Sequence, residues 1–252
     1  PLYPRVNIMS LIASRMSRIK PSPTVAASTR AQELQAAGES VINLGVGEPD
    51  FDTPLHIREA AIEAMNAGKT RYAPPQGIPE LRQAIVDKFR RENNLDYETD
   101  QVTVGAGGKQ VIFNAFTATI DDGDEVIVPA PYWVTYPDLA LLNGGVPVIV
   151  DCGVESGFKM TPRQLQDAIT PKTKWLVLNS PCNPTGGAYS ADELRALAEV
   201  LSRHPQVHVL SDDIYEHILY DGAQFATIAQ VAPALKERVL TMNGLSKSYC
   251  MT

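Results

Sequence analysis

From residue 101 to the end of the chain, short apolar runs rich in β-branched residues alternate with amphipathic segments. The apolar runs, which we expect to be strands, are Val102–Val104, Val126–Val128, Val146–Val150, Trp175–Leu178, Val207–Leu210 and Val239–Met242. The segments expected as helices are Val111–Ile120, Val134–Leu142, Pro162–Ile169 and Ala191–Leu201. Apolar strands separated by helices indicate an α/β fold, with a mainly parallel sheet covered by helices on both faces. In such sheets, ligands bind beyond the carboxyl ends of the strands.

The first hundred residues are less regular. Prolines interrupt residues 1–25, which we expect to form an arm and not part of the core. A helix is expected over Ser28–Ala37, ended by Gly38, and a short strand over Val41–Leu44. Two more helices are expected over Leu55–Ala67 and Pro79–Asn93. The second has proline in its first turn, where the missing N–H costs nothing.

Composition narrows the classes of partner. The 252 residues carry 22 Lys and Arg against 29 Asp and Glu, a net charge of −7 that argues against nucleic acid as a partner. No run approaches the ~18–20 apolar residues needed to span a membrane. The three cysteines (Cys152, Cys182 and Cys250) have no paired spacing, so we expect no disulfide framework and no metal site. A cytoplasmic location is the expectation.

Gly105-Ala106-Gly107-Gly108-Lys109 is a glycine-rich turn between an expected strand and an expected helix. Backbone N–H groups at the start of a helix can point at an anion, with the helix dipole behind them. Gln110 excludes the dinucleotide fingerprint, which needs glycine at that position. The motif is therefore either a phosphate cradle or a plain tight turn.

Three polar or aromatic side chains follow later strands. The indole of Trp133 can stack on a flat heteroaromatic ring or simply pack in the core. Asn183, on a proline-restricted turn, can donate to a phenolate or carboxylate oxygen. Asp212 either caps a following helix or holds a pyridine nitrogen protonated. At ~4 Å and an effective dielectric constant of ~20, such a charge pair is worth roughly 4 kcal/mol.

Lys247 lies in Asn243-Gly244-Leu245-Ser246-Lys247-Ser248-Tyr249, five residues before the last residue. A lysine amine can form a Schiff base only when it is unprotonated, although most lysines are solvated surface charges. Lys247 is distinguished by the two motifs upstream of it. These motifs are Asn179-Ser180-Pro181-Cys182-Asn183-Pro184-Thr185-Gly186 and Ser211-Asp212-Asp213-Ile214-Tyr215.

In their order and separation, these motifs resemble those of class I aminotransferases that depend on pyridoxal 5′-phosphate (PLP). The resemblance runs from about Ile19 to the last residue, and Tyr72-Ala73-Pro74-Pro75-Gln76-Gly77-Ile78-Pro79-Glu80-Leu81-Arg82 is especially similar to the bacterial aspartate/prephenate branch. It implies PLP fold type I, in which two subunits of a homodimer share each active site. Residues 1–50 would form an N-terminal arm and part of a small domain, and residues 51–252 the PLP-binding large domain, incomplete at its C-terminus.

The resemblance implies a role for each cofactor-binding residue. Lys247 resembles the lysine that binds PLP and moves the substrate proton, and Asp212 resembles the partner of the pyridine nitrogen. Tyr215 and Asn183 resemble the residues that bond the cofactor's 3′-oxygen, and Trp133 resembles the ring-stacking residue. The phosphate-binding positions, including a tyrosine that reaches the partner subunit's phosphate, correspond to Gly107, Gly108, Lys109 and Tyr72.

The substrate positions follow from the same resemblance. Gly47 and Asn183 correspond to contacts with the substrate carboxylate, beside Trp133. Lys109 corresponds to a lysine that holds a distal carboxylate with help from a serine and a threonine, here Ser22 and Thr24. The expected substrate is therefore a dicarboxylic amino acid such as aspartate or glutamate, unless Lys109 is an ordinary surface lysine.

The expected activity is amino transfer between an amino acid and a 2-oxo acid. The family's two arginines for the cofactor phosphate and the substrate α-carboxylate would fall beyond Thr252, so we expect a truncated chain without the C-terminal small domain. One alternative is a PLP-dependent lyase or synthase of the same fold. Another is the non-catalytic, aminotransferase-like effector domain of a transcription regulator.

Overall fold

The computed structural model describes residues 11–45 and 47–252 and contains a five-stranded sheet. Its strand order is β2-β1-β3-β4-β5, and each neighbouring pair is parallel. The strands are β1 (Glu125–Ala130), β2 (Val146–Asp151), β3 (Thr173–Asn179), β4 (His208–Asp212) and β5 (Val239–Met242). This arrangement confirms the predicted parallel sheet.

The helices occupy the segments between the strands and much of the N-terminal region. The α-helices are α1 (Pro23–Ala36), α2 (Leu55–Asn66), α3 (Pro79–Asn93), α4 (Gly108–Thr119), α5 (Thr135–Leu142), α6 (Pro162–Ala168), α7 (Ala191–Ser202) and α8 (Ile228–Val231). Short 3₁₀ turns are η2 (Ser14–Arg18), η3 (Thr99–Gln101), η4 (Val154–Ser156) and η5 (Pro233–Arg238). Within the described ranges, no helix is long and apolar enough to cross a membrane.

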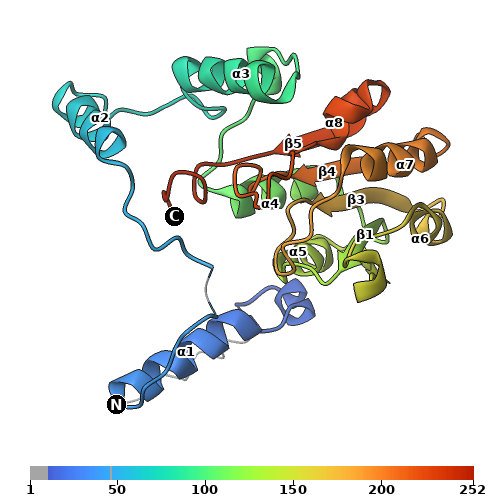
Figure 1. Ribbon diagram of the computed structural model, residues 1–252, viewed down its shortest axis with the longest axis horizontal. Coiled ribbons are helices and arrows are strands. Elements are labelled where there is room, and N and C mark those ends of the chain that lie inside the picture. The colour runs from blue at the N-terminus through green and yellow to red at the C-terminus, as the bar shows by residue number, and fades with distance from the viewer. Residues whose placement is uncertain (1–10, 46) are drawn as a thin grey trace.

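Helices cover both faces of the sheet (Figure 1). On one face, strand residues such as Ile127 and Leu176 pack against α6, α7 and α8. On the other face, Val126 and Val177 pack against α4 and α5. Successive strand residues thus point to opposite faces, and both sets are buried. This explains why the strands are apolar throughout and do not alternate with polar residues.

Two predicted strands are wrong. Val41–Leu44 and Val102–Val104 have no strand assignment, and neither pairs with the sheet. The N–H of Val104 instead donates to the carbonyl of Gln76 (3.0 Å), and Ile42 is 86% exposed. An apolar run becomes a strand only where a neighbouring strand can complete its hydrogen-bond ladder. For the same reason, the glycine-rich turn before α4 follows an extended segment and not a strand.

The first helix begins earlier than predicted. The expected range was Ser28–Ala37, whereas α1 begins at Pro23 with Ser22 as its N-cap, accepting from the N–H of Val25 (3.5 Å). Proline is favourable in the first turn, so it starts this helix and does not exclude one. Gly38 ends the helix as predicted, with φ of +90°. Both α1 and α2 lie apart from the sheet (Figure 1), and the predicted arm lies outside the described residues at positions 1–10.

A buried acid, Asp213, follows β4 directly. Its N–H donates to the carbonyl of Met242 (2.9 Å), and its Oδ1 accepts from Ser211 Oγ (2.8 Å). Its Oδ2 has no hydrogen-bond partner within the described part of the chain. Burial raises the pKa of Asp213 to about 8, against the opposing effect of the Thr227 and Ser211 hydroxyls. The folded state therefore holds a proton here that the unfolded chain releases near pH ~4.

This proton makes the free energy of unfolding depend on pH. Because the folded pKa lies above the unfolded one, Asp213 destabilises the protein progressively as pH rises through the window from pH ~4 to pH 8. We expect Asp213→Asn to remove that loss. The free energy of unfolding of the variant, relative to that of the wild type, should then increase with pH by up to about 1.4 kcal/mol per pH unit. Urea unfolding between pH 5 and 8 measures the difference. The exposed Asp167→Asn serves as control, and a constant difference across the range would contradict the assignment.

Candidate functional site

Several predicted site residues gather at the carboxyl ends of adjacent strands. Asp212 is the last residue of β4, and Asn179 is the last residue of the neighbouring β3. Lys247 follows five residues after Met242, the end of β5, which pairs with β4 on its other side. The carboxyl ends of parallel strands meet at one edge of a sheet, which is where ligands bind in open α/β folds.

Asp212 is a desolvated carboxylate with a single side-chain partner. It is 2% exposed, and the hydroxyl of Tyr136 donates to its Oδ2 at 2.5 Å. The N–H of Ile214 donates to Oδ1 (3.3 Å), so Asp212 caps a turn and not the helix that one interpretation expected. Burial raises the pKa of Asp212 to about 6, although both hydrogen bonds oppose the rise. A cation beside this carboxylate would favour its ionised form.

Asn183 and Tyr215 lie beside Asp212. The amide of Asn179 donates to the backbone carbonyl of Asp212 (3.0 Å), and the N–H of Asn183 donates to Asn179 Oδ1 (2.7 Å). Burial and the charge of Asp212 raise the pKa of Tyr215, whereas a hydrogen bond with the Asn183 side chain lowers it. Asp212, Asn179 and Asn183 thus form one hydrogen-bonded group around the end of β4, with Tyr215 beside it.

The start of α4 presents open backbone to this region. Gly107 is the N-cap, with φ of +86°, and a Cβ on it would meet nothing within 4 Å. A Cβ on Gly108 would lie 3.1 Å from Met242 Cε at the end of β5. The first N–H groups of a helix lack carbonyl partners within it and favour an anion. The geometry fits a phosphate cradle.

Lys109 contacts Trp133, and Trp133 contacts Tyr136, the hydrogen-bond partner of Asp212. The Lys109 ammonium lies 5.3 Å from the centroid of the Trp133 ring, in a cation–π contact. The Tyr136 ring packs against the same indole in a T-shaped arrangement, with the ring centroids 5.4 Å apart. A chain of contacts therefore runs from the start of α4 to the buried carboxylate.

Lys247 is half-buried in a turn after β5. Its Nζ donates to the carbonyl of Gly47, 2.5 Å away, which joins two predicted site residues that are 200 positions apart. The N–H of Tyr249 donates to the carbonyl of Leu245 (3.2 Å) and closes the turn. The lysine side chain thus extends towards the N-terminal segment.

Three further predicted residues belong neither to the Asp212 group nor to the contact between Lys247 and Gly47. Ser22 and Thr24 lie at the start of α1, and within the described residues neither forms a hydrogen bond with Lys109. Tyr72, between α2 and α3, is fully exposed. Their roles remain predictions.

Two residues at the site were missed by the sequence analysis, Tyr136 and Asn179. Tyr136 lies in the first turn of α5, three residues after Trp133, and its N–H donates to the carbonyl of Trp133 (3.1 Å). Asn179 is a polar residue that ends an apolar strand, which is the signal that could have identified it. Both line a cavity of about 20 Å³ that also touches Tyr132 and Asn183, with room for about one water molecule.

Known proteins resemble this chain over most of its length. The model of the family described as aminotransferase class I and II matches residues 39–252. An aspartate/prephenate aminotransferase of Cereibacter sphaeroides is 58% identical over 244 residues, 97% of this chain and 61% of that protein. An aspartate aminotransferase of Rhizobium meliloti is 52% identical over 240 residues, 95% of this chain and 58% of that protein.

Solved structures show the same fold. The aspartate aminotransferase structure from Rhizobium meliloti has a TM-score of 0.93 at 52% identity, covering 96% of this chain and 60% of that one. The Thermus thermophilus aspartate aminotransferase with maleate has a TM-score of 0.90 at 49% identity, covering 95% of this chain and 62% of that one. The chain thus spans about three fifths of the length of these relatives. On the match over residues 39–252, it belongs to the class I and II aminotransferase family.

Proposed function

We propose that this protein is a PLP-dependent aminotransferase that moves an amino group between an amino acid and a 2-oxo acid. The observation that carries the proposal is the buried Asp212, hydrogen-bonded to Tyr136 and grouped with Asn183 and Tyr215 at the edge of the sheet where Lys247 also lies. Relatives that are 58% and 52% identical carry aminotransferase names, which supports the same reaction class.

The residues present fit the functional groups of PLP. A pyridinium nitrogen would supply the cation that Asp212 lacks, an interaction of roughly 4 kcal/mol at an effective dielectric constant of ~20. The N–H groups at Gly107 and Gly108 would bind the phosphate at the start of α4, near Lys109. Tyr215 and Asn183 would bond the 3′-oxygen. Trp133 would stack on the ring, and Tyr72 would reach the phosphate held by the partner subunit.

When bound, PLP supplies an electron sink for the pair released at the substrate α-carbon. The protein's own residues supply the rest. The Lys247 amine would hold the cofactor covalently and, once released, would carry a proton to and from the substrate α-carbon. Asp212 would keep the ring nitrogen protonated, and Tyr136 would fix the orientation of that carboxylate through its 2.5 Å hydrogen bond.

We further propose that the substrate is a dicarboxylic amino acid such as aspartate or glutamate. Lys109 places a cation over Trp133, the residue expected beside the substrate, where it can attract a second carboxylate. Ser22 and Thr24 would assist it, and Gly47 would contact the α-carboxylate through its backbone. The Thermus thermophilus relative is described with maleate, itself a dicarboxylate.

The assembly proposed is a cytoplasmic homodimer with shared active sites, in which residues 1–50 belong to an arm and small domain and residues 51–252 to the large domain. Tyr72 is fully exposed, as a residue that contacts the partner's cofactor would be in a single chain. Ile42, Leu44 and Phe51 are 77–90% exposed, an apolar surface typical of subunit contacts. The cytoplasmic location proposed rests on the unpaired spacing of the three cysteines, which are free thiols in the structure.

The central assignment can be tested by locating the cofactor. After incubation with PLP and reduction with borohydride, we expect a pyridoxyl group on Lys247, identified by peptide mass mapping. Lys247→Ala should lose the label completely, because it lacks the reacting amine, whereas the exposed Lys172→Ala should keep it. Labelling that persists in Lys247→Ala would sink the assignment.

Asp212 provides a second test. Asp212→Asn removes the negative charge but keeps the shape, so the ring nitrogen loses an interaction of roughly 4 kcal/mol and turnover should fall about 10³-fold. Amino transfer from aspartate to 2-oxoglutarate measures the effect, with the exposed Asp87→Asn as control. Wild-type rates in Asp212→Asn would refute its proposed role, and release of thiol or ammonia without transfer would favour a lyase.

A further inference from the structure

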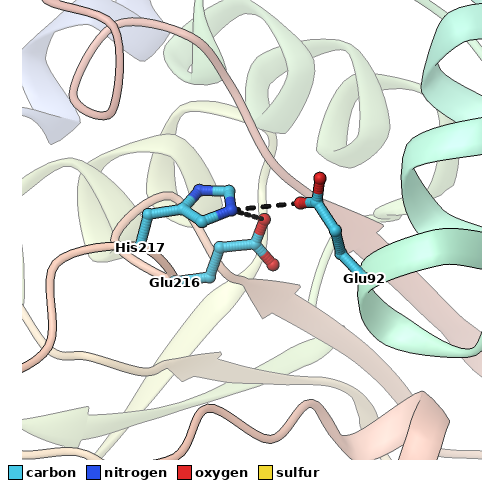
Figure 2. A group of neighbouring side chains, drawn as sticks. All are labelled: Glu92, Glu216 and His217. Carbon is cyan, nitrogen blue, oxygen red and sulfur yellow. Dashed lines mark hydrogen bonds and ion pairs between the residues drawn. The ribbon is translucent and has the colours of Figure 1, made fainter.

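A second cluster of charged side chains joins α3 to the turn after β4. It consists of Glu92 from α3 with Glu216 and His217 from the turn, and we call it the α3 cluster (Figure 2). Figure 2 shows both carboxylates directed at one nitrogen of the imidazole. His217 Nε2 lies 3.0 Å from Glu92 Oε2 and 3.5 Å from Glu216 Oε1. None of these residues was identified from the sequence.

The α3 cluster already contains its own cations, which argues against a metal site. Lys88 Nζ donates to Glu216 Oε1 and lies 3.7 Å from Glu92 Oε2. Glu216, 4% exposed, also accepts from Asn93 Nδ2 at 2.9 Å. Arg91 binds the other oxygen of Glu92 at 2.5 Å. Two carboxylates paired with two basic side chains leave little charge for a divalent ion, so the arrangement acts as a cross-link.

This cross-link determines what the other nitrogen of His217 can do. A carboxylate accepts hydrogen bonds, so the nitrogen that faces Glu92 and Glu216 must carry the proton. In the neutral ring, Nδ1 is then an acceptor. Ser248 Oγ lies 3.3 Å from Nδ1 and can donate to it. Ser248 directly follows Lys247 in the chain.

The other side-chain bonds to this turn come from a different part of the molecule. Lys247 Nζ donates to the carbonyl of Gly47, and Thr53 Oγ1 donates to the carbonyl of Cys250 at 2.6 Å. Both partners belong to the N-terminal segment 47–53, which has no buried residue. Within the described ranges, His217 is the side chain that bonds residues 246–249 from the α3 side.

We propose that His217 is a positioning residue for Lys247. Held by Glu92 and Glu216, its ring accepts a hydrogen bond from Ser248 and thereby fixes the turn that presents the Lys247 amine. The chemical consequence rests on the proposed role of Lys247 in binding PLP. The positioning itself concerns only contacts within this chain, so it can be measured without the cofactor.

Hydrogen exchange of the intact, cofactor-free protein provides the test. In Ser248→Ala and in His217→Gln, we expect backbone amides of residues 245–250 to exchange about 5-fold faster, the effect of losing roughly one hydrogen bond. Ser248→Thr keeps the hydroxyl and should restore wild-type exchange. His204→Gln is the matched control, because His204 is a partly exposed histidine bonded to Gln166 at 3.1 Å.

Two substitutions of the same histidine separate its two contacts. The side chain of Asn places an acceptor near the position of Nδ1, whereas that of Gln reaches the position of Nε2. We therefore expect His217→Asn to retain part of the protection of residues 245–250, and His217→Gln to retain none of it.

A second readout is the rate at which a small anhydride acetylates Lys247, relative to the rate at Lys172. This relative rate should change in the same variants.

Unchanged exchange of residues 245–250 in both Ser248→Ala and His217→Gln would overturn the proposal. Faster exchange spread over the whole chain would also overturn it, because that result means global destabilisation. Failure of PLP to label Lys247 in the wild-type protein would instead count against the proposed function. The two failures are distinguishable, because exchange is measured without PLP.

Discussion

Desolvation of Asp212 is the constraint on which the candidate site depends. A carboxylate that is 2% exposed loses most of its hydration, and its pKa rises to about 6. Within residues 11–45 and 47–252, only the Tyr136 hydroxyl and one backbone N–H compensate for the loss. Such a group is costly for a fold that has no cation to place beside it. Burial of Asp212 therefore favours a cationic ligand beside it on energetic grounds alone.

The sheet supplies that burial. β4 lies between β3 and β5, and both of its faces are covered by helices, so its last residue emerges from the core and not from the surface. Parallel pairing also places the residues that follow β3, β4 and β5 at a common edge. Residues far apart in the sequence, such as Asn183 and Lys247, reach the site because the topology directs each connection there.

The sequence predicted the parts that are governed by local pattern. The strands of the sheet and the helices between them follow from apolar runs. The motifs drew attention to Asn183, Asp212 and Tyr215, whose roles stay predictions. The prediction was wrong where secondary structure depends on a tertiary partner. The apolar run at Val102–Val104 is not a strand, because no strand of the sheet pairs with it. Tyr136 was missed because its role depends on a hydrogen bond that spans 76 residues.

The position of Lys247 relative to Asp212 depends on two supports of unequal rigidity. The contacts through Gly47 and Thr53 come from a segment without buried residues, so they cost little to open. His217 is held by Glu92 of α3. In the same helix, Phe89 is 6% exposed and packs with Ala229 of α8. A hydrogen bond anchored in packed structure restricts a turn more than one anchored in an exposed segment, because its partner cannot move away. On the proposed role of His217, the α3 side therefore restricts the turn that carries Lys247, whereas the bond between its amine and Gly47 opens at little cost.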